Sequence, residues 1–237
     1  MTHTAKTSKR SLTLAALLAL PLLACAAQAQ WRTLYQNDFE AREFGYEWSS
    51  NTRLESWYPT FTNFNGNYST EFTQLTLPAV PREPGRTGSP GGTGGSIDGT
   101  YRVTFDLYVI DSWDGSERTF GTDRLQVLVN NLSRFDHTFS NHNQAWQSFS
   151  APVASRRNLG FNDQWADAIY RDITIDIPAS TVTDRLAIRW QDTGLQGTND
   201  ESWGIDNINV SYNPIPAPGL PAAALASLAL VTTRRRR

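Results

Sequence analysis

The sequence predicts an all-β protein, folded as a two-sheet antiparallel β-sandwich. Between Trp31 and Asn213, no stretch repeats apolar residues at the spacing of an amphipathic helix. Short runs of alternating apolar and polar residues recur instead, separated by Gly, Asn, Asp, Ser and Pro. The 8 Trp, 8 Tyr and 11 Phe supply the large side chains that fill the space between two packed sheets.

The clearest predicted strand is YRVTFDLYVID at residues 101–111, where apolar side chains alternate with Thr, Asp and Tyr from Val103 to Val109. The run at 123–131 alternates in the same way, with its Leu and Val residues on one face. Further runs of this character lie at residues 31–40, 134–140, 144–153, 170–179, 184–194 and 203–212. The Pro- and Gly-rich segment 81–96 is expected to be a long exposed loop, because too few strands precede it to form a separate domain.

The first 29 residues have the pattern of a secretory signal peptide. Basic side chains in the first ten residues precede an apolar run at 12–24, and small residues at 27–29 suit cleavage after Ala29. Cys25 also stands in a sequence, LLAC, that resembles a lipoprotein box, which leaves lipidation as an alternative. It is the single cysteine of the chain, so simple cleavage would leave a mature protein without disulfide or thiol chemistry.

The last residues, 214–237, combine Pro216-Ala217-Pro218 with a short apolar stretch and four terminal arginines. The apolar stretch is shorter than the roughly 20 residues of a membrane-spanning helix. The arrangement resembles the PEP-CTERM sorting signal, in which Pro-Glu-Pro is usual where Pro-Ala-Pro stands here. That resemblance implies processing by an exosortase-like enzyme, membrane contact only through the tail before processing, and delivery to the cell surface or extracellular matrix. A plain anchor or a disordered basic tail is the alternative.

The charge of the segment between these ends excludes one class of function. Seven of the 21 Lys and Arg belong to the two ends, which leaves 14 arginines against 23 Asp and Glu and a net charge of −9. An acidic domain without lysine lacks the basic face that nucleic-acid binding requires. It suits a soluble extracellular protein or one that binds cations.

The edges of the predicted domain, residues 30–213, carry short motifs of known sandwiches. The strand end Asp38-Phe39-Glu40 and the closing Ile205-Asp206-Asn207-Ile208 resemble those of jelly rolls of the concanavalin A-like lectin type and of MAM domains. MAM domains carry cysteines that this chain lacks, so the resemblance implies a shared jelly-roll architecture and not membership.

Two carboxylates fall on apolar faces of predicted strands. Alternation places Asp111 on the face of Val109, and Asp206 on the face of Ile208. A buried carboxylate must be paired or must coordinate a metal, and Ca²⁺ takes about six to eight oxygen ligands. The acidic residues available are Asp38, Glu40, Asp111, Asp114, Asp200, Glu201 and Asp206.

We expect a structural Ca²⁺ held by Asp38, Glu40, Asp111 and Asp206, near the meeting of the first and last strands. Pairing of these acids with arginines, or capping of turns, is the alternative. The spacing matches no self-contained calcium loop.

The loop at 110–124 is the expected ligand site. Trp113 would form an exposed plate for the apolar face of a sugar, with Asp114, Asp123 and Arg124 bonding its hydroxyls. Other aromatics that could serve likewise, although core packing is their commoner role, are Trp57, Tyr58, Trp146, Trp165 and Trp203.

No catalytic constellation emerges from the sequence. The chain lacks the alternating carboxylate pattern of glycosidases on this fold, and His137 and His142 match neither a zinc spacing nor a nucleophile elbow. The expected function is therefore that of an exported, non-catalytic surface protein that binds or organises extracellular polysaccharide. A purely structural matrix protein and a glycoside hydrolase on the same fold are the alternatives.

Overall fold

The computed structural model describes residues 30–57, 60–81, 99–117, 119–157, 159 and 164–214. The predicted signal peptide, the tail beyond residue 214 and most of the Pro- and Gly-rich segment lie outside the described residues. All described residues belong to one compact unit, Ala29–Ile215. In the part of the chain that the structure describes, no helix is long and apolar enough to cross a membrane.

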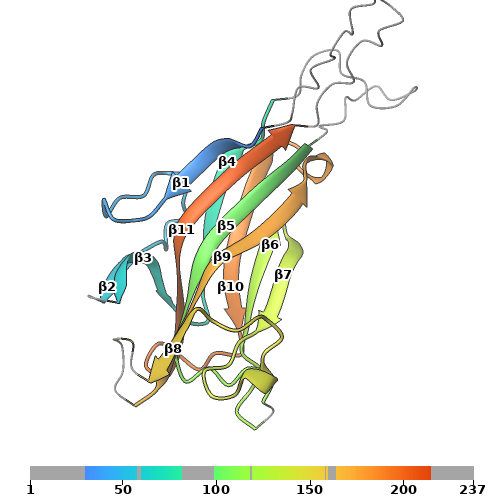
Figure 1. Ribbon diagram of the computed structural model, residues 1–237. Helices are drawn as coiled ribbons and strands as arrows, with labels where there is room; N and C mark the ends of the chain where they lie inside the picture. The colour runs from blue at the N-terminus through green and yellow to red at the C-terminus, as the bar shows by residue number, and fades with distance from the viewer. Residues whose placement is uncertain are drawn as a thin grey trace, which may run out of the picture. The chain divides into compact units, whose positions relative to one another are not determined.

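The fold is an antiparallel β-sandwich, as the sequence predicts (Figure 1). The first sheet has the order β2 (Leu54–Trp57), β3 (Phe61–Tyr68), β11 (Glu201–Pro214), β5 (Gly99–Asp111), β9 (Ala166–Pro178) and β8 (Ala154–Arg157), and β1 (Arg32–Asn37) also pairs with β11. The second sheet has the order β4 (Phe72–Pro78), β10 (Arg185–Thr193), β6 (Arg124–Val129) and β7 (Leu132–Thr138). Two short 3₁₀ helices, η1 (Gln144–Trp146) and η2 (Ala179–Thr181), lie in connections.

Strand β11 defines the two ends of the sandwich. It pairs with β5 along its whole length, from Glu201 opposite Asp111 to Pro214. Its other side is shared between β3, at residues 203–205, and β1, at residues 208–212. Glu201 and Asp111 therefore lie at one end of the sandwich, and the first and last described residues lie at the other (Figure 1).

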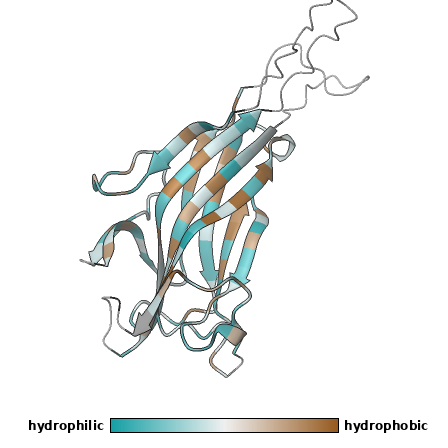
Figure 2. Cartoon of the chain, in the orientation of Figure 1, coloured by the Kyte–Doolittle hydropathy of each residue, from teal (hydrophilic) through white to brown (hydrophobic). Residues whose placement is uncertain are grey.

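The core fills the space between the two sheets. Val103, Phe105, Leu107 and Val109 of β5 are fully buried, which confirms the predicted alternation. Trp190 of β10 packs edge-on against Phe105, with ring centroids 5.8 Å apart. Hydrophobic and hydrophilic bands alternate along the strands in Figure 2, as two-faced sheets require. Truncating one of these buried aromatics to alanine would cost about 3–5 kcal/mol.

A second buried cluster lies on the opposite face of the first sheet. Phe61 and Phe64 of β3 cover Tyr108 and Ile110 of β5 together with Ile169 of β9. The rings of Phe61 and Phe64 meet that of Tyr108 at centroid distances of 4.9 and 5.1 Å. Alternation had placed Tyr108 on a polar face, but the aromatic side chains of β3 exclude water from it.

Some strands were not predicted, and one prediction is wrong. The run 144–153 is not a strand, because it begins with η1, whose first turn is capped by the Asn143 side chain accepting from the amide of Ala145. Strands β2, β3, β4 and β8 were missed. The sequence of β3, FTNFNGNY, contains turn-favouring Asn and Gly residues that conceal its strand character.

Candidate functional site

The candidate site lies at the end of the sandwich where β5 ends and β11 begins. Three connections contribute most of it: residues 112–123 between β5 and β6, 139–153 between β7 and β8, and 194–200 between β10 and β11; Trp165, just before β9, adds a fourth segment. Ser112 ties the first to the third. Its amide donates to the carbonyl of Asp200 over 3.0 Å, and its hydroxyl donates to Oδ1 of the same residue over 2.8 Å.

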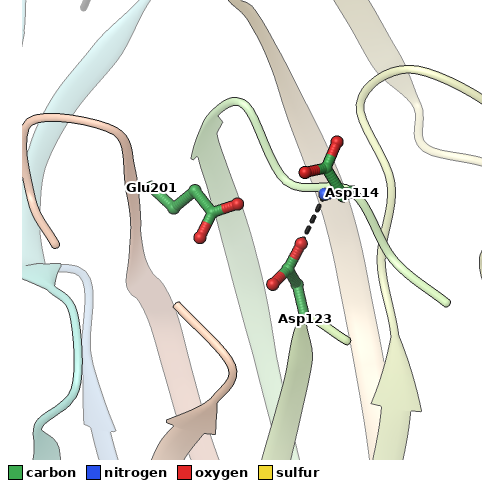
Figure 3. Close-up of side chains that lie close together, drawn as sticks. All are labelled: Asp114, Asp123 and Glu201. Carbon is green, nitrogen blue, oxygen red and sulfur yellow. Dashed lines mark hydrogen bonds between the residues drawn. The ribbon is translucent and has the colours of Figure 1, made fainter. Parts of the chain in front are cut away.

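Three carboxylates converge between these connections (Figure 3). Asp114, Asp123 and Glu201 each offer an oxygen atom within 4.8 Å of the others. Asp123 and Glu201 are fully buried, whereas Asp114 is only partly exposed. The three residues come from the loop after β5, the residue before β6 and the first residue of β11, so segments distant in sequence form one acidic cluster.

Each buried carboxylate of this cluster is half satisfied. Asp123 Oδ2 accepts from the amides of Asp114 and Gly115, and Glu201 Oε2 accepts from the amide of Gln196 over 3.0 Å. The other two oxygens, Asp123 Oδ1 and Glu201 Oε1, are buried without a hydrogen-bond partner. Such groups carry a desolvation cost of several kcal/mol unless a proton or a cation compensates them.

The electrostatics of the cluster favour uptake of positive charge. Burial raises the pKa of Glu201, and the nearby Asp123 raises it further. Burial likewise raises the pKa of Asp123; the hydrogen bond from the Asp114 amide opposes this increase, and the charge of the Asp114 carboxylate adds to it. The pKa of Asp114 is raised by burial and lowered by His142, whose Nε2 lies 3.5 Å from Asp114 Oδ1. The arrangement can therefore hold a shared proton or a metal ion.

A pocket of about 600 Å³ opens beside this cluster and shares Asp114 with it. Among the described residues, three aromatic side chains line it: Phe120, Trp146 of η1 and Trp165. Phe120 is 67% exposed and Trp146 is 37% exposed. The polar groups around them are Ser112, Asp114, Glu117, Thr119, His142, Gln196 and Asp200. Exposed aromatic rings surrounded by carboxylates and an amide are suited to a polar, ring-shaped ligand.

The predicted ligand residues are only partly at this pocket. The prediction that Trp113 is exposed is wrong: its side chain is fully buried, and its Nε1 donates to the carbonyl of Ser202 over 2.8 Å. Asp123 is buried below the pocket, and Arg124 pairs with Asp136 on the outer surface over 2.6 Å. Of the four predicted residues, Asp114 lines the pocket and the other three do not.

The other aromatics named from the sequence divide between pocket and core. Trp146 and Trp165 line the pocket, whereas Trp203 is fully buried and donates its Nε1 hydrogen to Asp192 Oδ2. Trp57 is 44% exposed at the edge strand β2. Tyr58 lies outside the described residues.

The four predicted metal ligands do not gather around one point. Asp111 pairs with Glu201 and Asp206 pairs with Asp106, so five residues of strand, about 16 Å, separate Asp111 from Asp206. The prediction of one ion bound by all four predicted residues is therefore wrong. Burial raises the pKa of Asp111 to about 7, helped by Asp167 and then by Asp200, and its Oδ1 has no hydrogen-bond partner.

Asp38 and Glu40 act as turn residues. Asp38 Oδ1 accepts from the amide of Glu40 over 3.2 Å, and Glu40 Oε2 accepts from Asn63 Nδ2. Both carboxylates make hydrogen bonds at the exposed surface, just after β1. The end of β1 pairs with Ile208 of β11, so these residues lie away from Glu201, at the start of β11.

Asp206 is buried for a different reason from the one predicted. The pairing of β5 with β11 shifts register between Asp206 and Asn209, and Asn207 has a φ of 49°. Because of this bulge, Ile205 and Ile208 both enter the core between the sheets. The Asp206 carboxylate turns to the opposite face of the first sheet, toward the second buried cluster that contains Tyr108. There it accepts from the Tyr108 hydroxyl over 2.8 Å.

The alternation rule could have identified two members of the acidic cluster. Asp123 has the parity of Leu125 and Val127, and Glu201 has the parity of Trp203 and Ile205. Both acids therefore sit on core-facing positions at strand ends, as Asp111 does. Their spatial proximity depends on the sheet order, which the sequence does not contain.

Comparison with known proteins assigns no family to the chain: no protein-family model and no curated protein matches it. Among solved structures, dimeric latent PorU from Porphyromonas gingivalis aligns with a TM-score of 0.43 and 11% identity over 81% of this chain and 14% of that chain. The Agl-KA catalytic domain aligns with a TM-score of 0.32 and 16% identity over 82% of this chain and 30% of that one. The Stig cyclase Fisc from Fischerella sp. TAU aligns with a TM-score of 0.31 and 15% identity over 78% and 85%. Likenesses this distant carry no argument about function.

Proposed function

We propose that this protein is an exported, non-catalytic binding module for extracellular polysaccharide, and that the pocket lined by Phe120, Trp146 and Trp165 is its binding site. The observation that carries the proposal is the grouping of partly exposed aromatic rings with carboxylate and amide side chains in one pocket of about 600 Å³. Aromatic rings pack against the apolar faces of pyranose rings, while Asp114, Gln196 and similar groups bond their hydroxyls.

The position of the pocket agrees with a role at a surface. It lies at the end of the sandwich where β11 begins, whereas β11 ends at the opposite pole with Pro214. An attachment through the segment that follows Pro214 would hold the pocket away from the point of attachment. Export and sorting rest on the signal-peptide and tail patterns of the sequence alone.

The experiment is a panel of soluble polysaccharides in affinity electrophoresis, with hits quantified by calorimetry. The Trp146→Ala and Trp165→Ala variants should each weaken binding by about tenfold or more, which corresponds to about 1.4 kcal/mol or more for a lost stacking contact. Tyr46→Ala is the matched control, because Tyr46 is fully exposed and does not line this pocket. If no polysaccharide in the gel slows the migration of the wild-type protein, the alternative of a purely structural matrix protein is favoured.

A glycoside hydrolase is the second candidate. Asp114 and Asp200 both line the pocket, and burial raises the pKa of Asp114, as a general acid requires. Release of reducing ends from a bound polysaccharide, abolished by Asp114→Asn, would establish the hydrolase. Binding without any such release supports the module.

A further inference from the structure

The acidic cluster beside the pocket combines close carboxylates with buried oxygens that have no hydrogen-bond partner. Ligand atoms of Asp114, Asp123 and Glu201 lie within 4.8 Å of one another. Asp123 Oδ1 and Glu201 Oε1 have no hydrogen-bond partner, although both side chains are 0% exposed. In Figure 3 the Glu201 carboxylate points toward the two aspartates across the space between them. If both carboxylates are ionised, this buried pair requires a compensating positive charge.

We propose that Asp114, Asp123 and Glu201 bind one calcium ion. Oxygens that share one Ca²⁺ at about 2.3–2.6 Å lie at most about 5 Å apart, a limit that the three carboxylates meet. The ligands are carboxylates, which select hard cations over zinc or copper. The proposal concerns this ion alone and does not depend on carbohydrate binding.

Two glycines lie close to the unpartnered oxygen of Asp123. A Cβ atom at Gly194 would lie 3.2 Å from Asp123 Oδ1, and one at Gly121 would lie 4.0 Å from it. Their φ angles are 101° and 134°, so side chains are also disfavoured by backbone strain. Both glycines therefore let the backbone pass close to Asp123. Ca²⁺ needs about six to eight oxygens, so the ion would take further ligands, such as backbone carbonyls or water, beside the three carboxylates.

The ion would join segments that are far apart in the sequence. Asp114 and Asp123 belong to the connection between β5 and β6, and Glu201 is the first residue of β11. Among the described residues, the His142 ring reaches this cluster, with Nε2 3.5 Å from Asp114 Oδ1. A proton shared between Asp123 and Glu201 is the competing way to neutralise the buried pair, and it predicts no response to metal.

The test is calorimetric titration of the chelator-treated protein with CaCl₂, together with thermal unfolding in excess Ca²⁺ and in EDTA. We expect one Ca²⁺ per chain and a Tm that is about 5–10 °C higher at a Ca²⁺ concentration of about 100 times Kd. Glu201→Gln and Asp123→Asn should lower Ca²⁺ affinity by at least about a hundredfold and abolish the Tm increase. Asp206→Asn, a buried carboxylate outside the cluster, should keep both.

The two cluster variants also control for misfolding. Each removes one charge from an uncompensated buried pair, so in EDTA each should unfold at or above the Tm of the wild type. A wild-type protein that binds no Ca²⁺ and has the same Tm in Ca²⁺ and EDTA would establish the shared proton and overturn the proposal. Retained binding in both variants would place the ion elsewhere and overturn it equally.

Discussion

Asp106 and Asp206 face each other directly across β5 and β11, as two carboxylates that are 3% and 2% exposed. Their surroundings differ. Arg171 Nη1 donates to Asp106 Oδ2 over 2.5 Å, whereas Asp206 accepts from the neutral Tyr108 hydroxyl and from the amide of Asn207. Asp106 thus has a formal counter-ion, and Asp206 has dipoles alone. Protein donors therefore reach both of these buried acids.

The stability of the protein should therefore depend on pH through Asp206. Burial raises the pKa of Asp206 to about 6 from an ordinary value of 3.8. The folded form keeps this proton to higher pH than the unfolded chain, so its contribution is fully present below about pH 4 and is lost as pH rises through 6. The free energy of unfolding should fall by on the order of 2–3 kcal/mol from this group over that window.

The measurement is denaturant unfolding of the wild type and of Asp206→Asn at intervals from pH 4 to pH 7. Since the amide does not titrate, the free energy of unfolding of the variant should rise steadily relative to that of the wild type from pH 4 to pH 7. A constant difference between the two proteins would show that Asp206 is ionised in the folded state throughout.

The same strand shows how far the sequence could be interpreted. Alternation correctly assigned Ile208 and Val210 to the core, and it failed at Asp206 because a bulge at Asn207 reverses which face each side chain takes. A single residue with positive φ is a local backbone choice that alternation does not detect. The β-sandwich was predictable because many runs alternate, whereas the single bulge at Asn207 made the predicted orientation of Asp206 wrong.

The second buried cluster, which contains Phe64, should tolerate no side chain at the two glycines that pack against it. Gly66 and Gly204 are cross-strand partners in β3 and β11, and a Cβ on either would collide with the ring of Phe64. Gly204→Ala should lower the free energy of unfolding by about 1–3 kcal/mol through overpacking. Chemical denaturation measures this loss.

A double-mutant cycle identifies the cause of that loss. In a Phe64→Leu background the ring is gone, so the added methyl group of Gly204→Ala should cost clearly less than in the wild type. Equal costs in the two backgrounds would locate the strain in the backbone and not in the contact with Phe64.

The pocket was harder to predict than the sheets because its residues come from four separated places. Phe120, Trp146, Trp165 and Gln196 lie in different connections, and each alone resembles a loop residue. Trp113 had the stronger local pattern, a tryptophan between two aspartates, yet it points inward. The direction of a loop side chain depends on which strands the loop joins, and the sheet order supplies that information.

Substitutions of Trp113 and Trp146 should thus affect different properties of the protein. Trp113→Phe removes the indole donor to the Ser202 carbonyl and should lower the free energy of unfolding by about 1–3 kcal/mol. Trp146→Ala removes a partly exposed ring and should change stability by less, within about 1 kcal/mol. Thermal unfolding and polysaccharide affinity, measured on both variants, should show separate losses. If Trp113→Phe bound polysaccharide more weakly under conditions where it is fully folded, the assignment of Trp113 to the core and not to the binding site would be wrong.

Polysaccharide affinity should depend on calcium, a prediction that rests on both proposals together. Asp114 lines the pocket and belongs to the acidic cluster, so an ion held there fixes the position of one polar contact and of the connection that carries Phe120. Without the ion, that connection adopts the binding conformation only part of the time, so the apparent affinity for polysaccharide is lower. We expect EDTA to weaken binding of the wild type several-fold, and Glu201→Gln, whose side chain does not line the pocket, to bind equally weakly with or without Ca²⁺. Affinity electrophoresis in both buffers measures the difference. Full affinity in EDTA would separate the two sites, leaving an ion that stabilises the fold and a pocket that binds independently of it.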